Sequence, residues 1–256
     1  MTQFRIEGVS KVFPIPQALG AKEADALLSY WADSDDVEVL CALARGGFLH
    51  GKLMNDTRLG IKPAVAMGGG FLKALSRDKD PQVRAAVAIT GAYHDKLIND
   101  CPAVLCGVAM GGGYHDRLYQ HENNYVRQAV AIGGGYHDVL INDPDPVVVA
   151  GVAEGGGFTE RLLDHPDEKV RAGVALSGRH HDILINDSSK RVLASIAQAG
   201  GHLEHLSTNL DFLVQQEVKH AVLDRYVGLI KDAMKAEKTR EPSPENFAFL
   251  RSLSYS

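Results

Sequence analysis

The sequence has few of the features that mark secreted, membrane or metal-thiolate proteins. It contains 3 cysteines in 256 residues. Because Cys41, Cys101 and Cys106 form no CxxC pair, the sequence predicts neither a disulfide framework nor a thiolate metal site. No run approaches the roughly 18 apolar residues of a membrane helix, and the first residues lack the apolar segment of a secretion signal. We therefore expect a soluble, cytoplasmic protein with no membrane partner.

An excess of positive charge is also absent. The formal net charge is -5, and it comes from residues 33–209, which hold 17 Lys and Arg against 22 Asp and Glu. An acidic surface is a poor match for phosphates, so a nucleic-acid partner is disfavoured. The chain also lacks the motifs GxSxG, HExxH and GxxxxGK[ST], and no nucleophile stands beside a base. We predict no cofactor, no metal and no catalytic residue.

Glycine and histidine are plentiful, and they are concentrated in the same region. Residues 33–209 hold 23 of the 26 glycines and 10 of the 11 histidines, as a tandem array would. The residue that follows each glycine cluster recurs every 21 to 23 residues. We call these residues the anchors: Phe48, Phe71, Tyr93, Tyr114, Tyr136, Phe158, His180 and His202.

Other positions keep a fixed distance from the anchor. In seven units a Val-Ala or Ile-Ala pair begins six residues before it, and a leucine stands four residues after it. A longer period of about 44 residues is also visible, because charged and apolar side chains alternate nine residues before the anchor. The alternating residues are Arg84, Leu105, Arg127, Val149, Arg171 and Leu193.

Each unit carries the signals of two short helices. Asp145 followed by Pro146 is a helix start, and Asp80 with Pro81 repeats it. The alanine-rich stretch that follows ends at glycines, which can adopt the left-handed conformation that terminates a helix. The anchor and the leucine four residues later suit one face of a second, shorter helix. Because such helices cannot bury their apolar faces alone, we predict an all-α solenoid of about eight 22-residue repeats.

The units resemble those of a known repeat family. The stretches DPDPVV from Asp143, HPDEKVRAGVA from His165 and KDPQVRAAVA from Lys79 are similar to the leucine-rich repeat variant family, which is related to HEAT-type repeats. The resemblance covers roughly residues 33–209 and implies a right-handed stack of α and 3-10 helices. It implies little about activity. The glycine triplets and the lack of an N-terminal cysteine cluster depart from the family pattern, so its iron–sulfur site is not carried over.

A parallel β-helix is the alternative architecture, because its rungs can be equally long and VRQAVAI from Val126 reads as a strand. Central alanines, Asp-Pro starts and the charged pair Glu168-Lys169 in a first turn favour helices. Outside the array we expect an N-terminal cap over residues 1–32, with a strand or hairpin in 4–13 and a helix over 21–31. We also expect capping helices over 210–238 and a mobile tail over 239–256.

Three recurring groups are candidates for chemistry. The histidines that precede an aspartate would lie in a row, but a row spaced by about 8–10 Å cannot converge on one zinc ion. The glycine triplets could cradle phosphate, although helix termination explains them. Arginines recur in every second unit and could bind phosphate or carboxylate. The acids of the preceding turns, Asp80, Glu122 and Asp167, favour ion pairs with these arginines within the unit.

The pattern as a whole predicts a non-enzymatic repeat scaffold that binds a protein or peptide along its solenoid surface. The candidate contact residues are Tyr93, His94, Tyr114, His115, Tyr136, His137, Phe158, His180 and His181, with Arg84, Arg127 and Arg171 as secondary candidates. One alternative is a nucleic-acid binder similar to HEAT-like DNA glycosylases, which would need a basic concave face. The other is a protein that binds metal through the histidine row.

Overall fold

The computed structural model describes residues 15–239, and these form 18 helices and no strand. The predicted all-α repeat architecture is confirmed, and the alternative parallel β-helix is wrong, because the valines and alanines of the units lie in helices. The strand predicted within residues 4–13 and the tail predicted beyond residue 239 lie outside the described residues. No helix in the described part of the chain is both long and apolar enough to cross a membrane.

Helices of two lengths alternate after α1 (Ala21–Ala32). Each unit contributes a first helix and then a short helix of four residues. The first helices are α2 (Val37–Arg45), α4 (Ile61–Met67), α6 (Pro81–Ile89), α8 (Pro102–Met110), α10 (Asn124–Ile132), α12 (Pro146–Glu154), α14 (Glu168–Leu176) and α16 (Lys190–Gln198). The short helices are α3 (His50–Leu53), α5 (Leu72–Leu75), α7 (His94–Leu97), α9 (His115–Leu118), α11 (His137–Leu140), α13 (Thr159–Leu162), α15 (His181–Leu184) and α17 (Leu203–Leu206). We number these helix pairs as units 1 to 8, and α18 (Phe212–Thr239) follows them.

The predicted start signal is present in α12, and the predicted glycine stop signal is present at the end of α8. In α12 the Asp145 side chain accepts a hydrogen bond from the backbone N–H of Val147, and Pro146 occupies the first helical position. At the end of α8, Gly112 adopts a φ of +84°, which glycine reaches without side-chain strain. The Gly113 N–H then donates to the carbonyl of Val108 over 2.9 Å, which satisfies a terminal acceptor of the helix.

The anchor adopts the left-handed conformation in every unit, with φ between 48° and 59°. In unit 1 this residue is Leu49 and not Phe48, so the predicted anchor of that unit is wrong by one position. An anchor is defined by its backbone conformation, and an aromatic ring is not required there. With Leu49 the spacing to Phe71 becomes 22 residues, and Leu53 takes its place among the leucines four residues after the anchor.

The core lies between the first helices and the short helices. In unit 3, Val83, Val87 and Ala88 of α6 and Leu97 of α7 are all buried, and the equivalent residues are buried in the other units. Neighbouring first helices also approach one another closely. A Cβ atom on Gly107 would collide with the backbone of Ala85 in the preceding unit. Small residues at this position therefore set the tight stacking of one unit on the next.

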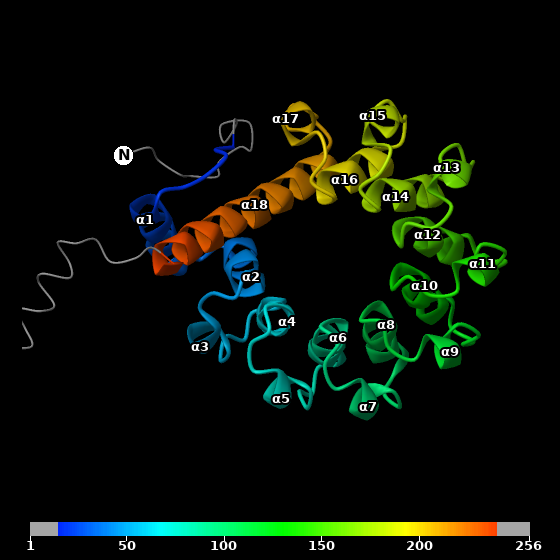
Figure 1. Cartoon of the computed structure of the whole chain (residues 1–256), viewed down its shortest axis with the longest axis horizontal. Helices are drawn as coiled ribbons and strands as arrows, with labels where there is room; N and C mark the ends of the chain where they lie inside the picture. Colours follow the sequence, from blue (N-terminus) through cyan, green and yellow to red (C-terminus); the bar gives the residue numbers. More distant parts are fainter. Residues whose placement is uncertain (1–14, 240–256) are drawn as a thin grey trace, which may run out of the picture.

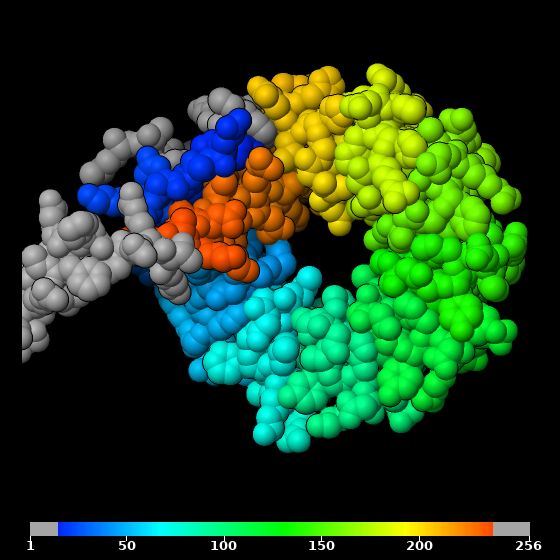
Figure 2. Space-filling view, in the orientation of Figure 1, coloured from blue at the N-terminus to red at the C-terminus, as the bar shows by residue number. Residues whose placement is uncertain are grey.

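The stack of units bends into a ring, which Figure 1 shows along its short axis. The first helices form the inner wall, and the short helices form the outer rim. Figure 2 shows that side chains leave a central opening. Helix α18 crosses from unit 8 to unit 1 and packs against α16, α17, α1 and α2. The ring is therefore closed by a helix that does not belong to the eight units.

Helix α18 begins as the first helix of a ninth unit. Asp211 accepts from the Leu213 N–H over 3.0 Å, as the N-cap residues of five first helices do. Val214 and Val218 are buried at the spacing of the core valines of the units. Where a unit would have its glycines, residues 221–223 are Ala, Val and Leu. Without a glycine to end it, the helix continues to 28 residues and reaches unit 1.

Helix α18 is held to α1 and to unit 1 by apolar and ionic contacts. Tyr226 packs edge-on against Trp31 of α1, with ring centroids 6.2 Å apart, and both residues are buried. The Arg45 side chain donates to Asp224 over 2.7 Å. Lys219 forms ion pairs with both Asp36 and Glu38 of the α2 N-terminus. These contacts join the two ends of the array through one continuous helix.

Candidate binding surfaces

The histidine that follows the anchor is bound to the first helix of its own unit. In five units its Nε2 atom lies 2.7–2.8 Å from the carbonyl oxygen of the alanine six residues earlier. The pairs are His50 with Ala44, His94 with Ala88, His115 with Ala109, His137 with Ala131 and His181 with Ala175. Since a carbonyl oxygen can only accept, Nε2 carries a proton and donates it. The ring is thereby a second donor to a carbonyl at the C-terminal end of the first helix, which also accepts from the backbone N–H three residues later.

The same histidine packs against the glycines of the next unit. The His94 ring lies over Gly113, and a Cβ atom at that glycine would come well within 3.0 Å of the ring. A Cβ atom on Gly111 would collide with both the Ala88 carbonyl and His94 Nε2. The outer glycines of a triplet therefore make room for the neighbouring unit, whereas the middle glycine provides the left-handed turn.

Residue choices in adjacent units follow this contact. Every unit that comes after a histidine unit has glycine just before its anchor: Gly70, Gly113, Gly135, Gly157 and Gly201. Units 2 and 6 have Leu72 and Thr159 in place of the histidine. The units that follow them have Ala92 and Arg179 in place of the glycine. The histidine and the glycine thus exchange together, as expected for a pair in direct contact.

The histidine row does not assemble a metal site. In unit 3, for example, Nε2 of His94 faces the Ala88 carbonyl and Nδ1 faces Gly113. Both nitrogens are therefore turned away from the neighbouring histidines. Over residues 15–239, no group of three or more His, Cys, Asp or Glu side chains is placed so that it could hold a metal ion. A metal could enter the row only if the rings left their carbonyl partners.

The anchor side chains lie at the start of the short helices, on the outer rim. The exposed fraction is 48% for Phe71, 38% for Tyr136 and 36% for Phe158. Tyr93, Tyr114 and His180 are half-buried. The aromatic part of the predicted stripe is therefore accessible from outside, while the histidines beside it are engaged in the contacts between units.

Several anchor rings are already covered by residues of this chain. The Lys96 amino group lies 5.0 Å from the centre of the Tyr93 ring, and Arg117 lies 5.5 Å from that of Tyr114. Tyr119 stacks on Tyr136 with the ring centroids 4.1 Å apart. Such contacts stabilise by about 0.5–1.5 kcal/mol. A partner that bound these anchor rings would have to displace Lys96, Arg117 and Tyr119, or stack on the outside of these three side chains.

The arginines that recur in every second unit form bidentate ion pairs. Nε of Arg84, Arg127 and Arg171 lies 2.7–2.8 Å from the carboxylate of an aspartate 16 residues later. The partners are Asp100, Asp143 and Asp187, so the predicted pairing with Asp80, Glu122 and Asp167 is wrong. The reason is that Asp80 and Asp167 already accept from backbone N–H groups as N-caps. With their donors engaged and 17–19% of the side chains exposed, these arginines are poor phosphate ligands.

Removing one carboxylate of these pairs should destabilise the protein in a pH-dependent way. The Arg84 hydrogen bonds lower the pKa of Asp100 to about 2. A depressed folded-state pKa contributes stability above the ordinary aspartate pKa of about 3.9, and this stability is lost as the pH falls through the folded value. We expect Asp100→Asn to cost about 2 kcal/mol at pH 7 and progressively less toward pH 2, as measured by urea unfolding. Asp95→Asn, at an exposed position, is the control and should change little; equal losses at pH 7 and pH 2 would contradict the assignment.

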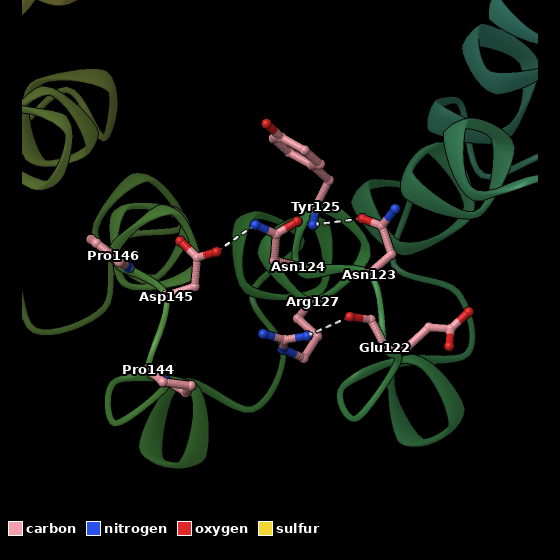
Figure 3. A pocket seen from close by; sticks show the side chains of 8 residues that line it. All are labelled: Glu122, Asn123, Asn124, Tyr125, Arg127, Pro144, Asp145 and Pro146. Carbon is pink, nitrogen blue, oxygen red and sulfur yellow. Dashed lines mark hydrogen bonds between the residues drawn. The ribbon is translucent and has the colours of Figure 1, made fainter.

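A shallow depression between units 5 and 6 is lined by residues that bond to one another. Figure 3 shows Asn124 donating to Asp145, and Arg127 donating to the Glu122 carbonyl over 3.2 Å. The Tyr125 N–H donates to Asn123 over 2.9 Å, while its ring points away from this network. The polar groups therefore do not converge on an unfilled centre, and the depression is a joint between two units.

The inner wall presents the face of each first helix that lies opposite the core valines. Positions eleven, eight and four residues before the anchor share this face, because they are separated by three and four residues. Four residues before the anchor, most units have an apolar side chain, and we call four consecutive ones the wall strip: Met67, Ile89, Met110 and Ile132. The exposed fraction is 46% for Met67, 39% for Met110 and 59% for Tyr125, which lies on the same wall.

Sequence reasoning missed the wall strip because its side chains resemble the last core residues of each helix. A helical projection would have separated them, since they lie on the side away from Val83 and Val87 and their equivalents. In unit 6 the equivalent position is Glu154, and burial raises the pKa of its carboxyl group. The wall therefore offers a mainly apolar surface over units 2 to 5.

No family model, no curated protein and no solved structure matches this chain. The resemblance to leucine-rich repeat variants therefore rests on the repeat pattern of the sequence alone. Any function has to be argued from the geometry of the ring itself.

Proposed function

We propose that the protein is a non-enzymatic scaffold that holds a polypeptide segment, from a protein or a peptide, against the inner wall of its ring. The wall strip carries this proposal, because Met67 and Met110 are exposed and Ile89 and Ile132 beside them are only half-buried. Methionine is flexible and polarisable, and it suits a surface that adapts to different apolar side chains. Exposed apolar patches of this kind mark interaction sites more often than isolated surface residues do.

The size of the opening favours a single chain segment as the ligand. Nine helices spaced by about 9 Å form a circle about 26 Å across between helix axes. Subtracting a helix diameter of about 10–12 Å leaves an opening about 15 Å wide. One helix or one extended segment fits this space, whereas a folded domain does not. The proposal therefore concerns a terminus, a loop or a peptide.

The charge of the wall gives no support to the nucleic-acid alternative. The charged side chains at the wall positions are Glu38, Arg45, Glu154, Lys169 and Arg191. Two of the three basic groups are engaged, since Arg45 pairs with Asp224 and Arg191 with Glu168. A wall that binds a phosphate backbone would need several unpaired basic groups. The apolar strip is the more distinctive property of this surface.

Charged substitutions in the wall strip should abolish peptide binding. Peptides would be selected against the full chain from a random display library, and their affinity measured by fluorescence anisotropy. We expect Met67→Glu with Met110→Glu to raise Kd at least about tenfold, since a carboxylate would be desolvated against an apolar ligand. Both side chains are partly exposed, so the fold should tolerate the change.

The matched control places the same charges on the outer rim. Val139 and Ile183 lie on short helices, and their exposed fractions are 53% and 57%. The double variant Val139→Glu with Ile183→Glu should leave Kd unchanged. If the outer variant weakened binding and the inner variant did not, the ligand would bind at the anchor row. A library that yielded no binder would argue against a peptide-binding function altogether.

A further inference from the structure

We propose that the polypeptide held in the opening carries a lysine or an arginine, and that the carboxylate of Glu154 on the inner wall binds this cationic side chain. The inference rests on the proposed function, because it assigns the chemistry of the ligand at the same wall. The ligand is then a segment with an apolar side and a cationic group at the edge of that side.

Glu154 is the one acidic residue among the wall positions four residues before the anchor. It is the last residue of α12, and the equivalent residues of the two neighbouring units are Ile132 and Leu176. Its position lies on the side of α12 away from the buried valines Val148 and Val152. A carboxylate therefore stands at the end of the wall strip, one unit beyond Ile132.

The Glu154 carboxylate has no partner within residues 15–239. No described side chain or backbone group bonds to it, and burial raises its pKa without a contribution from a neighbouring charge. Lys169, the basic wall residue of the next unit, stands in the first turn of α14, whereas Glu154 ends α12. By contrast Glu38, the other acidic residue at the wall positions, forms an ion pair with Lys219. The described chain therefore supplies no cation to Glu154.

A segment in the opening would contact Glu154 as well as the wall strip. The opening is about 15 Å wide and a helix with its side chains is about 10–12 Å across, so a bound segment has wall on every side. Nine helices divide the ring into steps of about 40°, so units 2 to 5 face about 160° of the segment and unit 6 faces the next step. The ligand side chain that faces unit 6 therefore displaces water from the carboxylate.

The cost of removing water from an unpaired carboxylate determines which ligand side chain fits there. An apolar side chain would leave the charge of Glu154 without a partner, and an acidic one would add repulsion. A lysine or arginine replaces the lost water with a charge-assisted hydrogen bond, and arginine can donate two at once. In a helical ligand, apolar residues would recur every three to four positions, with the basic residue beside that stripe.

Parallel selections test this assignment. A random peptide display library is selected against the full chain, against Glu154→Gln and against Glu160→Gln. Glutamine keeps the size of the side chain and removes its charge. Glu160 is the matched control, because it is an exposed acid of the same unit on the outer rim. Peptides selected on the unmodified chain and on Glu160→Gln should be enriched in lysine and arginine, and those selected on Glu154→Gln should not.

A double-mutant cycle on one selected peptide measures the contact itself. Its basic residue is replaced by norleucine, which keeps an aliphatic chain without the charge. Kd should rise at least about tenfold on the unmodified chain and less than about twofold on Glu154→Gln. The midpoint of urea unfolding of Glu154→Gln should not fall, because burial disfavours the charge that this substitution removes. Fluorescence anisotropy gives the four values of Kd.

The outcomes separate this inference from the function on which it rests. Equal losses of affinity on the unmodified chain and on Glu154→Gln would overturn the role of Glu154, and so would an effect of Glu160→Gln as large as that of Glu154→Gln. If Met67→Glu with Met110→Glu still abolished binding in that case, the wall would remain a peptide site. A library that yielded no binder to any of the three chains would refute the proposed function, and this inference with it.

Discussion

Replacing Gly113 by alanine is expected to destabilise the ring by about 1–3 kcal/mol, and adding His94→Leu is expected to recover most of this loss. The new Cβ atom would lie against the His94 ring of the preceding unit, where there is no space for it. Units 2 and 3 already have the compensated pair of residues, since Leu72 and Ala92 stand at the equivalent positions there. His94→Leu alone should cost about 1 kcal/mol, because the Ala88 carbonyl keeps the Gly91 N–H but loses its second donor.

Urea unfolding of the two single variants and the double variant completes a thermodynamic cycle. The control is Gly112→Ala, at a glycine with φ of +84° and no neighbouring atom within 4 Å of an added Cβ. Its cost of about 1 kcal/mol is backbone strain, which His94→Leu cannot relieve. Additive effects of His94→Leu and Gly113→Ala would show that the two residues are not coupled, and would remove the explanation given for the glycine triplets.

Ala221→Pro is expected to open the ring while the eight units stay folded. The substitution breaks α18 where a unit would have its glycines, at a cost of about 3 kcal/mol or more to the helix. The second half of the helix, with Tyr226, Val227 and Ile230, should then leave α1 and α2. Small-angle X-ray scattering should show a larger radius of gyration, and limited proteolysis should cut near residue 221.

Phe212→Pro is the matched control for this experiment. Phe212 is exposed and stands at the first position of α18, the position that proline occupies in α6, α8 and α12. Proline there lacks only an N–H that has no helical partner, so the ring should remain closed. If Ala221→Pro gave the same scattering curve as Phe212→Pro, closure would not depend on the continuity of α18.

Local signals were sufficient to predict the helices of the units. Asp145, Pro146 and the following glycines act within a few residues of one another, so their effect can be read along the sequence. The anchor of unit 1 was misplaced because the residue after the glycines was taken as the anchor. In unit 1 that residue is Phe48, which stands where other units have a third glycine, and Leu49 adopts the anchor conformation. The arginine partners were misassigned because sequence distance favours the acid of the preceding turn, which in two units is already engaged as an N-cap.

Contacts between units were harder to predict, although one signal was available. Where Leu72 or Thr159 replaces the histidine, Ala92 or Arg179 replaces the glycine of the next unit. This joint replacement is visible in the sequence and indicates a contact between neighbouring units. This signal predicts a packing role for the histidines. It would have made the inner wall, and not the outer rim, the candidate binding surface. Closure of the ring has no such local signal, because it depends on small rotations accumulated over all units.

Closure by α18 changes how the array can unfold. In an open row of repeats the end units have one neighbour, so they fray first and unfolding spreads inward. Here α2 and α16 each have a neighbour on both sides, since α18 covers the faces that an open row would leave bare. Loosening any unit therefore breaks two stacking surfaces at once. The molecule has no weakest end, and it should unfold as one cooperative body, where an open row would unfold from its termini.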